Sequence, residues 1–219
     1  MIGIARRRIS PTEREYEYVD LGLSSGLLWA KCNIGATTET DYGLYFSWGE
    51  TDGYVTASAK TNGFTWESYK YNNDGSSPKA SNMSKYNSTD KKTVLDLEDD
   101  AARVNMGGEW RMPTYREYQE LLNNTTKTFV TNYNGTGVNG ILLTSKTNQN
   151  AKLFFPANGV CSDGIVSNIG SRGNYFSSSL YTSNRLNSYS LYFNDAGSIY
   201  YTDGYRSPGY CVRGVRSSN

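Results

Sequence analysis

Residues 174–216 read NYFSSSLYTSNRLNSYSLYFNDAGSIYYTDGYRSPGYCVRGVR, and this stretch decides how the rest of the chain is interpreted. It contains eight tyrosines, interleaved with Ser, Asn, Thr, Asp and Gly. From residue 174 to the end the chain has no Lys, Glu, Gln, Met, Trp or His, whereas residues 1–173 hold thirty residues of the first five types. We therefore treat residues 174–216 as a distinct unit and call it the cassette.

The composition of the cassette fits two kinds of structure. Tyrosine offers a large amphipathic contact area at a low entropic cost, and small polar residues give adaptable hydrogen bonds, as in antibody combining sites. Tyrosine and threonine also favour strands, so the same composition is typical of a tyrosine-rich β-meander. Composition alone leaves both interpretations open.

The whole chain has 219 residues and a net charge of +1. This length suffices for one domain with a substantial core. We expect a polar arm at residues 1–15, which holds three consecutive arginines, and one domain over residues 16–219. The near-neutral charge does not point to nucleic acid or to a membrane surface as a partner. No apolar run reaches the roughly 18 residues of a membrane-spanning helix.

The usual catalytic residue sets are missing from this sequence. The chain has no histidine, which excludes Ser-His-Asp and Cys-His pairs and histidine metal sites. Cys32, Cys161 and Cys211 are widely spaced, so we expect free and mostly buried thiols. An acidic metal site at residues 98–100 is disfavoured, because adjacent carboxylates on a helix point in different directions. We predict no catalytic residues, no cofactor and no metal.

Local patterns predict an α+β fold with two main helices and short, mostly antiparallel strands. Thr114 and Glu117 have the spacing of a helix capping box. Residues 51–93 are rich in turn formers and are expected to form an insertion loop. The predicted helices cover residues 94–104 and 114–123, and the clearest predicted strands cover residues 18–21, 27–32, 138–145 and 151–157.

Several apolar and charged residues are expected to have structural roles. Trp110 is assigned to the core, and Arg111 is expected to pair with a carboxylate. The segment with Tyr42, Phe46 and Trp48 is interpreted as core, with a saccharide-stacking platform as the alternative. Further predicted core residues are Leu21, Leu23, Leu28, Trp29, Phe176, Leu191, Phe193, Val212 and Val215.

Several segments resemble the Fibrobacter-type major paralogous domain family. The resemblance rests on residues 18–36, residues 41–50, residues 107–114 and residues 138–159, and on YFSSSLYTS at residues 175–183 and GYCVRGVR at residues 209–216. Phe176 stands where the family normally has Trp, and Gly214 stands where it often has Pro. The resemblance implies a C-type-lectin-like fold of the kind abundant in gut Bacteroidetes, including Bacteroides, and their phages.

Some members of this family are variable proteins of diversity-generating retroelements. In these proteins, AAY codons are randomised to NNY, which encodes none of Lys, Glu, Gln, Met and Trp. The resemblance therefore implies a randomised cassette whose variable positions share one exposed face. The predicted ligand-binding residues are Tyr181, Arg185, Leu186, Asn187, Ser190, Tyr192, Tyr200, Thr202, Asp203, Gly204, Tyr205, Ser207, Pro208 and Tyr210.

Strand alternation refines this expectation, because Tyr192 must point away from Leu191 and Phe193. We expect Tyr192, Tyr200, Tyr205 and Tyr210 to form one anchor cluster, with Arg185 and Asp203 at its rim. Energy at protein interfaces concentrates in such Tyr and Arg residues.

Two biological roles fit a binding protein of this kind. The first is a phage tail receptor-binding protein that binds a bacterial surface protein or glycan, with the arm contacting other virion tail proteins. The alternative is a bacterial cell-surface or fimbrial-tip adhesin. A secretory signal has its charged residues before a longer apolar core, an order that residues 1–15 lack, so the first role is favoured.

Overall fold

The computed structural model describes residues 16–75 and 77–218, so the predicted arm at residues 1–15 lies outside the described residues. The described chain is mixed α+β and mostly sheet, with the helices α1 (Ala101–Met106) and α2 (Tyr115–Asn124). The strands are β1 (Tyr18–Asp20), β2 (Leu27–Ala30), β3 (Tyr45–Phe46), β4 (Thr125–Val130), β5 (Gly140–Ser145), β6 (Lys152–Pro156), β7 (Val160–Ser162), β8 (Ile165–Ser167), β9 (Arg172–Leu180), β10 (Asn187–Asn194), β11 (Ile199–Tyr205), β12 (Tyr210–Cys211) and β13 (Val215–Ser217).

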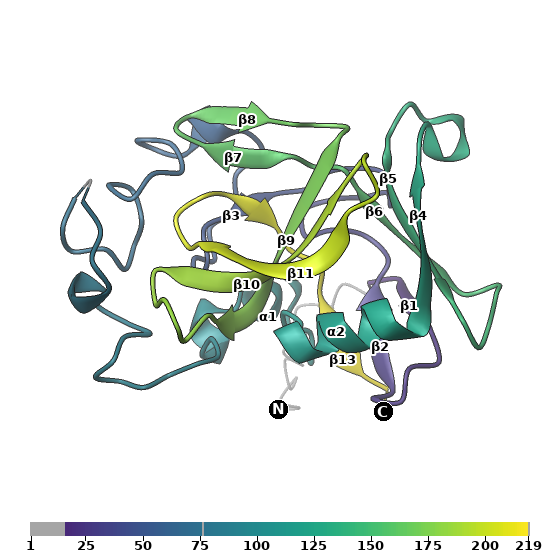
Figure 1. Ribbon diagram of the computed structural model, residues 1–219, viewed down its shortest axis with the longest axis horizontal. Helices are drawn as coiled ribbons and strands as arrows, with labels where there is room; N and C mark the ends of the chain where they lie inside the picture. Colours follow the sequence, from purple (N-terminus) through teal and green to yellow (C-terminus); the bar gives the residue numbers. More distant parts are fainter. Residues whose placement is uncertain (1–15, 76, 219) are drawn as a thin grey trace, which may run out of the picture.

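The cassette supplies most of the central five-stranded sheet, which has the order β11-β10-β9-β12-β3. All its pairings are antiparallel except the one between β12 and β9. Smaller sheets are formed by β4, β5 and β6, by β1, β2 and β13, and by β7 and β8. In Figure 1 the β4-β5-β6 sheet lies to one side of the central sheet, and the insertion at residues 51–93 lies to the other.

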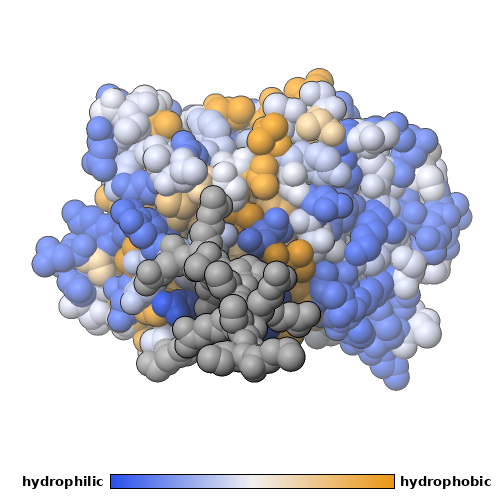
Figure 2. All heavy atoms as spheres, turned by 180° about the vertical axis from the view of Figure 1, so that it is seen from behind, coloured by the Kyte–Doolittle hydropathy of each residue, from blue (hydrophilic) through white to orange (hydrophobic). Residues whose placement is uncertain are grey.

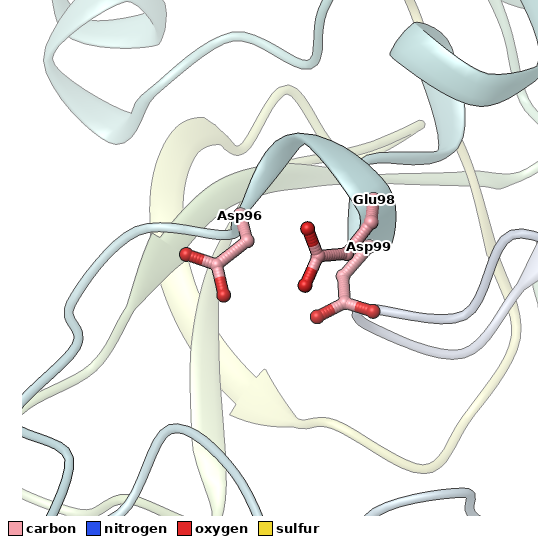
Figure 3. A group of neighbouring side chains, drawn as sticks. All are labelled: Asp96, Glu98 and Asp99. Carbon is pink, nitrogen blue, oxygen red and sulfur yellow. The ribbon is translucent and has the colours of Figure 1, made fainter.

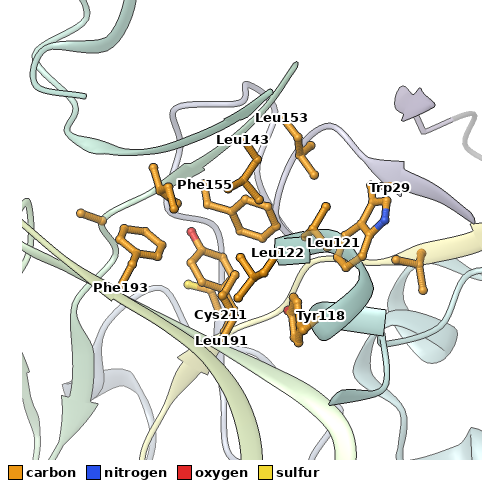
Figure 4. Packing of buried hydrophobic residues seen from close by; sticks show 14 of the residues in the cluster. Trp29, Tyr118, Leu121, Leu122, Leu143, Leu153, Phe155, Leu191, Phe193 and Cys211 are labelled. Atoms are coloured by element: carbon orange, nitrogen blue, oxygen red, sulfur yellow. The ribbon is translucent and has the colours of Figure 1, made fainter. Parts of the chain in front are cut away.

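One hydrophobic core lies between the central sheet, α2 and the β4-β5-β6 sheet. Figure 4 shows Phe193 and Leu191 from β10 facing Phe155 from β6 and the α2 residues Tyr118 and Leu122. These side chains are at most 6% exposed. Because three separate elements contribute to this core, it fixes one face of β10 firmly in the interior.

A second core lies on the opposite face of β9. Tyr175 belongs to the first core, whereas its neighbour Phe176 packs in the second, as expected for successive residues of a strand. The second core includes Trp48, Tyr86 and Val212. Side chains of the insertion, α1 and the cassette pack together in this core. The turn-rich insertion is therefore packed against the cassette.

The sequence signal for α2 is confirmed. The Thr114 hydroxyl accepts a hydrogen bond from the Glu117 amide at 3.3 Å, and the Glu117 carboxylate accepts one from the Thr114 amide at 2.7 Å. Arg111 donates two hydrogen bonds to the same carboxylate, at 2.6 and 2.8 Å. The expected pairing of Arg111 with a carboxylate is therefore also confirmed, and the pKa of Arg111 is raised by that bond.

The predicted helix at residues 94–104 is wrong at its start. Leu95 donates its amide to the Ser178 carbonyl at 2.9 Å, which holds this segment against β9 in an extended conformation. After a 3₁₀ turn at Leu97–Asp99, the Asp100 side chain accepts a hydrogen bond from the Arg103 amide and caps α1. The acidic residues thus precede the helix and do not form its first turns.

Several further predictions on strands, core residues and cysteines are confirmed in the described chain. The predicted strands around residues 18–32 and 138–157 form the antiparallel pairs β1-β2 and β5-β6. Phe46 and Trp48 are fully buried, so the core interpretation is confirmed for both and a stacking platform is wrong for them, whereas Tyr42 of the same segment is only half-buried. All nine further core residues predicted from the sequence are also buried: Leu21, Leu23, Leu28, Trp29, Phe176, Leu191, Phe193, Val212 and Val215. The three cysteines are free, with Cys161 and Cys211 buried and Cys32 partly so.

No helix among the described residues is long and apolar enough to cross a membrane. Figure 2 shows the face turned away from the viewer in Figure 1; in its coloured part hydrophilic residues predominate and apolar residues lie in small separate groups.

Candidate functional site

The hairpin of β10 and β11 separates scaffold residues from exposed ones. Leu191 and Phe193 are fully buried against the first core, whereas Tyr192 between them is only half-buried. The predicted reversal of Tyr192 relative to its two neighbours is therefore confirmed. β11 is the edge strand of the sheet, and its Tyr200 and Tyr205 are 48% and 53% exposed.

Tyr192 and Tyr200 form one aromatic pair on the hairpin. They are partners in the β10-β11 register, and their ring centroids are 5.1 Å apart. The Arg172 guanidinium lies over the Tyr192 ring at 5.4 Å from its centroid. The Asn194 side-chain amide donates to the Tyr192 hydroxyl at 3.1 Å, so Tyr192 has one contact on its ring and one on its hydroxyl.

The expected four-tyrosine cluster does not form. Tyr205 contacts Trp66 of the insertion, with centroids 5.5 Å apart, because it lies at the end of β11 far from Tyr200. Tyr210 packs over Phe176 at 4.4 Å, and burial raises the pKa of its phenol. The four predicted anchor tyrosines thus lie in three places: Tyr192 with Tyr200, Tyr205 beside Trp66, and Tyr210 on Phe176.

The two predicted rim residues also lie apart. The Arg185 guanidinium donates to the Lys92 carbonyl at 3.4 Å, which fastens it to the insertion. Asp203 is exposed and accepts a hydrogen bond from the Asn187 amide at 2.7 Å. Asp203 is therefore the charged residue within the β10 and β11 strands, and Asp195 in the turn between them is exposed as well.

Two of the predicted binding positions are not on the surface. Ser190 is 2% exposed and Ser207 is 3% exposed, so the expectation that they lie on an exposed face is wrong. Ser190 is paired with Phe176, whose ring is covered by Tyr210. The Ser207 carbonyl accepts a hydrogen bond from the buried Ser47 hydroxyl. The remaining half-buried positions are Tyr181, Arg185, Leu186, Asn187, Thr202, Gly204, Pro208 and Tyr210.

A second group of tyrosines, which the sequence interpretation missed, lies on the helix side of the hairpin. Tyr115 at the start of α2 stacks on Tyr189 of β10 at 4.5 Å, and Tyr201 of β11 lies 6.1 Å from Tyr115. Tyr181 meets the Tyr189 ring edge-on at 5.3 Å. Alternation in β10 places Tyr189 on the same face as Leu191, a signal that was available in the sequence.

Two buried arginines hold the C-terminal part of the cassette. Arg213 is fully buried and donates to four acceptors, among them the Asn33 side chain at 2.8 Å and the Phe154 carbonyl at 3.1 Å. Arg206 is also fully buried, and it donates to the Tyr86 carbonyl at 3.3 Å. Because Tyr86 belongs to the insertion, Arg206 joins the insertion to the end of the exposed hairpin.

An acidic group is the one metal candidate within the described part of the chain. Oxygens of Asp96, Glu98 and Asp99 lie within 4.8 Å of one another (Figure 3). The Lys85 ammonium binds all three, at 2.7, 3.2 and 2.5 Å. Asp100, which the sequence grouped with them, instead caps α1. The Lys85 ammonium therefore occupies the position between the three carboxylates where a cation would bind.

Comparison of the chain with family models, with curated proteins and with solved structures finds no match.

Proposed function

We propose that this protein is a non-catalytic binding protein whose exposed cassette residues contact a bacterial surface protein or glycan. The observation that carries the proposal is the alternation of Leu191, Tyr192 and Phe193. A strand used only for packing has no need of a large amphipathic ring on its outer face. Here the outer face carries Tyr192 and its cross-strand partner Tyr200, beside Arg172.

The chemistry of these residues supports recognition more than catalysis. Tyr and Arg are enriched among the residues that contribute most to binding at interfaces. Tyrosine loses little conformational entropy on binding because it has two side-chain torsions. The Asn194 and Arg172 contacts hold Tyr192 before any ligand arrives, and such preorganisation lowers the entropic cost of binding.

The C-type-lectin-like fold and the role as a variable phage tail protein belong to the same proposal. They rest on the resemblance of the sequence motifs to the Fibrobacter-type family and on the residue types that the cassette lacks. The mixed α+β architecture, in which buried cassette residues alternate with exposed ones, agrees with such a role. A bacterial surface adhesin would use the same surface in the same way.

The test is binding of the fluorescently labelled protein to a panel of intact gut Bacteroidetes strains, measured by flow cytometry. We expect at least one strain to bind the wild-type protein. The same strain should show no binding of the Tyr192→Ala/Tyr200→Ala variant. Tyr18→Ala is the matched control, because Tyr18 is also 48% exposed but lies on β1, outside the cassette. Equal binding of all three proteins would reject the proposed surface.

A further inference from the structure

Trp66 differs from the other tryptophans of the chain in its exposure. Trp29 and Trp48 are fully buried and Trp110 is 6% exposed, whereas Trp66 is partly exposed on the insertion. Its ring lies against the cassette residue Tyr205 at 5.5 Å, with the two planes at 70°. A tryptophan from the insertion thus lies beside a cassette position that is itself more than half exposed.

The position of Trp66 is fixed by the insertion. Its ring meets that of the buried Tyr69 at 5.6 Å, and the Arg206 guanidinium lies 5.3 Å from the Tyr69 ring. The Trp66 carbonyl accepts a hydrogen bond from the Asn72 side chain at 2.9 Å. The rings of Trp66 and Tyr205 therefore form an angled aromatic pair. The contacts with Tyr69 and Asn72 hold Trp66 in this position.

Polar groups continue from this corner along the hairpin. Asn187 is the register partner of Tyr205, and Asp203 is two residues from Tyr205, so all three share one face of the hairpin. The Asn187 amide donates to Asp203, while its side-chain oxygen is buried and has no hydrogen-bond partner among the described residues, so the exposed polar group of the strip is the Asp203 carboxylate. Tyr201 follows on the same face, roughly 13 Å from Tyr205 along β11 at the usual rise per residue.

We infer that this strip, defined as Trp66, Tyr205, Asn187, Asp203 and Tyr201, binds an extended glycan. The inference rests on the proposed function and assigns its ligand class. Tyr201 and Asp203 pair with Leu191 and Tyr189, so the strip lies on the opposite face of the hairpin from the Tyr192–Tyr200 pair. It adds two residues, Trp66 and Tyr201, to the predicted binding residues. The strip presents aromatic rings at both ends and hydrogen-bonding groups between them.

The chemistry of the strip favours a glycan over a protein. Electron-rich ring faces attract the weakly positive C–H groups of a sugar ring. The exposed Asp203 carboxylate only accepts hydrogen bonds, which sugar hydroxyls can donate. A protein partner would bury this carboxylate at the centre of the contact, where protein interfaces are depleted of charge. The strip also contains no aliphatic side chain to form an apolar contact with a protein.

The experiment uses the full chain and a strain that binds it. The same cells are measured untreated, after periodate oxidation of vicinal diols, and after proteinase K digestion. We expect periodate to abolish binding and proteinase K to leave it intact. We expect Trp66→Ala and Asp203→Asn to weaken binding about tenfold or more, while Tyr18→Ala binds like the wild type. Asp203→Asn is included because Trp66→Ala also removes packing against Tyr69.

Tryptophan fluorescence supplies a second measurement. Iodide should quench mainly Trp66, because the other three tryptophans are buried, and polysaccharide extracted from the bound strain should protect it. The inference is overturned if proteinase K abolishes binding and periodate does not, which would identify a protein partner. It is also overturned if Trp66→Ala and Asp203→Asn bind normally while Tyr192→Ala/Tyr200→Ala does not, a result that leaves the proposed function intact. If no strain binds the wild-type chain, both fail.

Discussion

Replacing Phe193 by alanine should destabilise the fold strongly. Its ring is fully buried, lies 6.2 Å from Tyr175 and 6.5 Å from Phe129, and covers the Gly173 backbone of the neighbouring strand. Strands on both sides of β10 are hydrogen-bonded to it, so the site cannot collapse to fill the space. A truncation of this kind costs about 3–5 kcal/mol. For a domain of this length, that corresponds to a fall in Tm of roughly 6–20 °C.

The assay is chemical denaturation followed by circular dichroism, with Tyr192→Ala as the matched variant on the same strand. Tyr192 is half-buried and lies outside both cores. We expect its replacement to lower the free energy of unfolding by about 1 kcal/mol or less. If Phe193→Ala cost no more than Tyr192→Ala, the assignment of the inner and outer faces of β10 would be refuted.

Three further predictions concern the scaffold. Gly173→Ala should destabilise the fold by about 1–3 kcal/mol in a urea titration, because a new methyl group would overlap the Phe193 ring; an unchanged midpoint would contradict this packing. Thr114→Ala should cost about 1 kcal/mol through loss of the α2 cap, and a thermal melt equal to that of the wild type would show that the cap contributes nothing. Burial of the Asp99 carboxyl opposes its ionisation, but hydrogen bonds led by that from Lys85 outweigh burial and hold its pKa at about 2. Because this pKa lies below the unfolded value of about 3.9, the stabilisation is present above that value and is lost as the pH falls towards 2. Asp99→Asn should therefore lose less stability over that interval than the wild type, and equal losses in acid denaturation would argue against the assigned ion pairs.

Sequence patterns predicted correctly those features of the fold that depend on interactions between neighbouring residues. The capping box of α2 needs only Thr114 and Glu117, and β10 alternation needs only Leu191 to Phe193, so both are readable from neighbouring residues. The start of α1 was mispredicted because the Leu95 amide bonds to Ser178, which is distant in the sequence. Long-range backbone pairing overrode the helical pattern there.

The sequence predicted most of the exposed residues of the candidate site, but not how those residues are arranged in space. Tyr192 and Tyr200 pair as neighbours on adjacent strands, a contact that hairpin register alone brings about. Trp66 was not predicted, because the turn-rich insertion gave no indication that it would fold against Tyr205. Ser190 is likewise the register partner of Phe176 on β9, whose ring packs against Tyr210 on β12, an arrangement that the sequence near Ser190 does not indicate.

The central claim is that the exposed cassette residues, Tyr192 and Tyr200 among them, bind the ligand, while the buried Leu191 and Phe193 hold the fold. The most direct measurement is the dissociation constant of Tyr192→Ala/Tyr200→Ala for a strain that binds the wild-type protein, taken with the Tm of the same preparation. We predict that binding weakens about thirtyfold or more, as for the loss of an interface hot spot worth about 2 kcal/mol. The Tm should fall by only a few degrees. Unchanged affinity, or a loss of affinity matched by unfolding of the variant, would contradict the claim and make these tyrosines part of the scaffold.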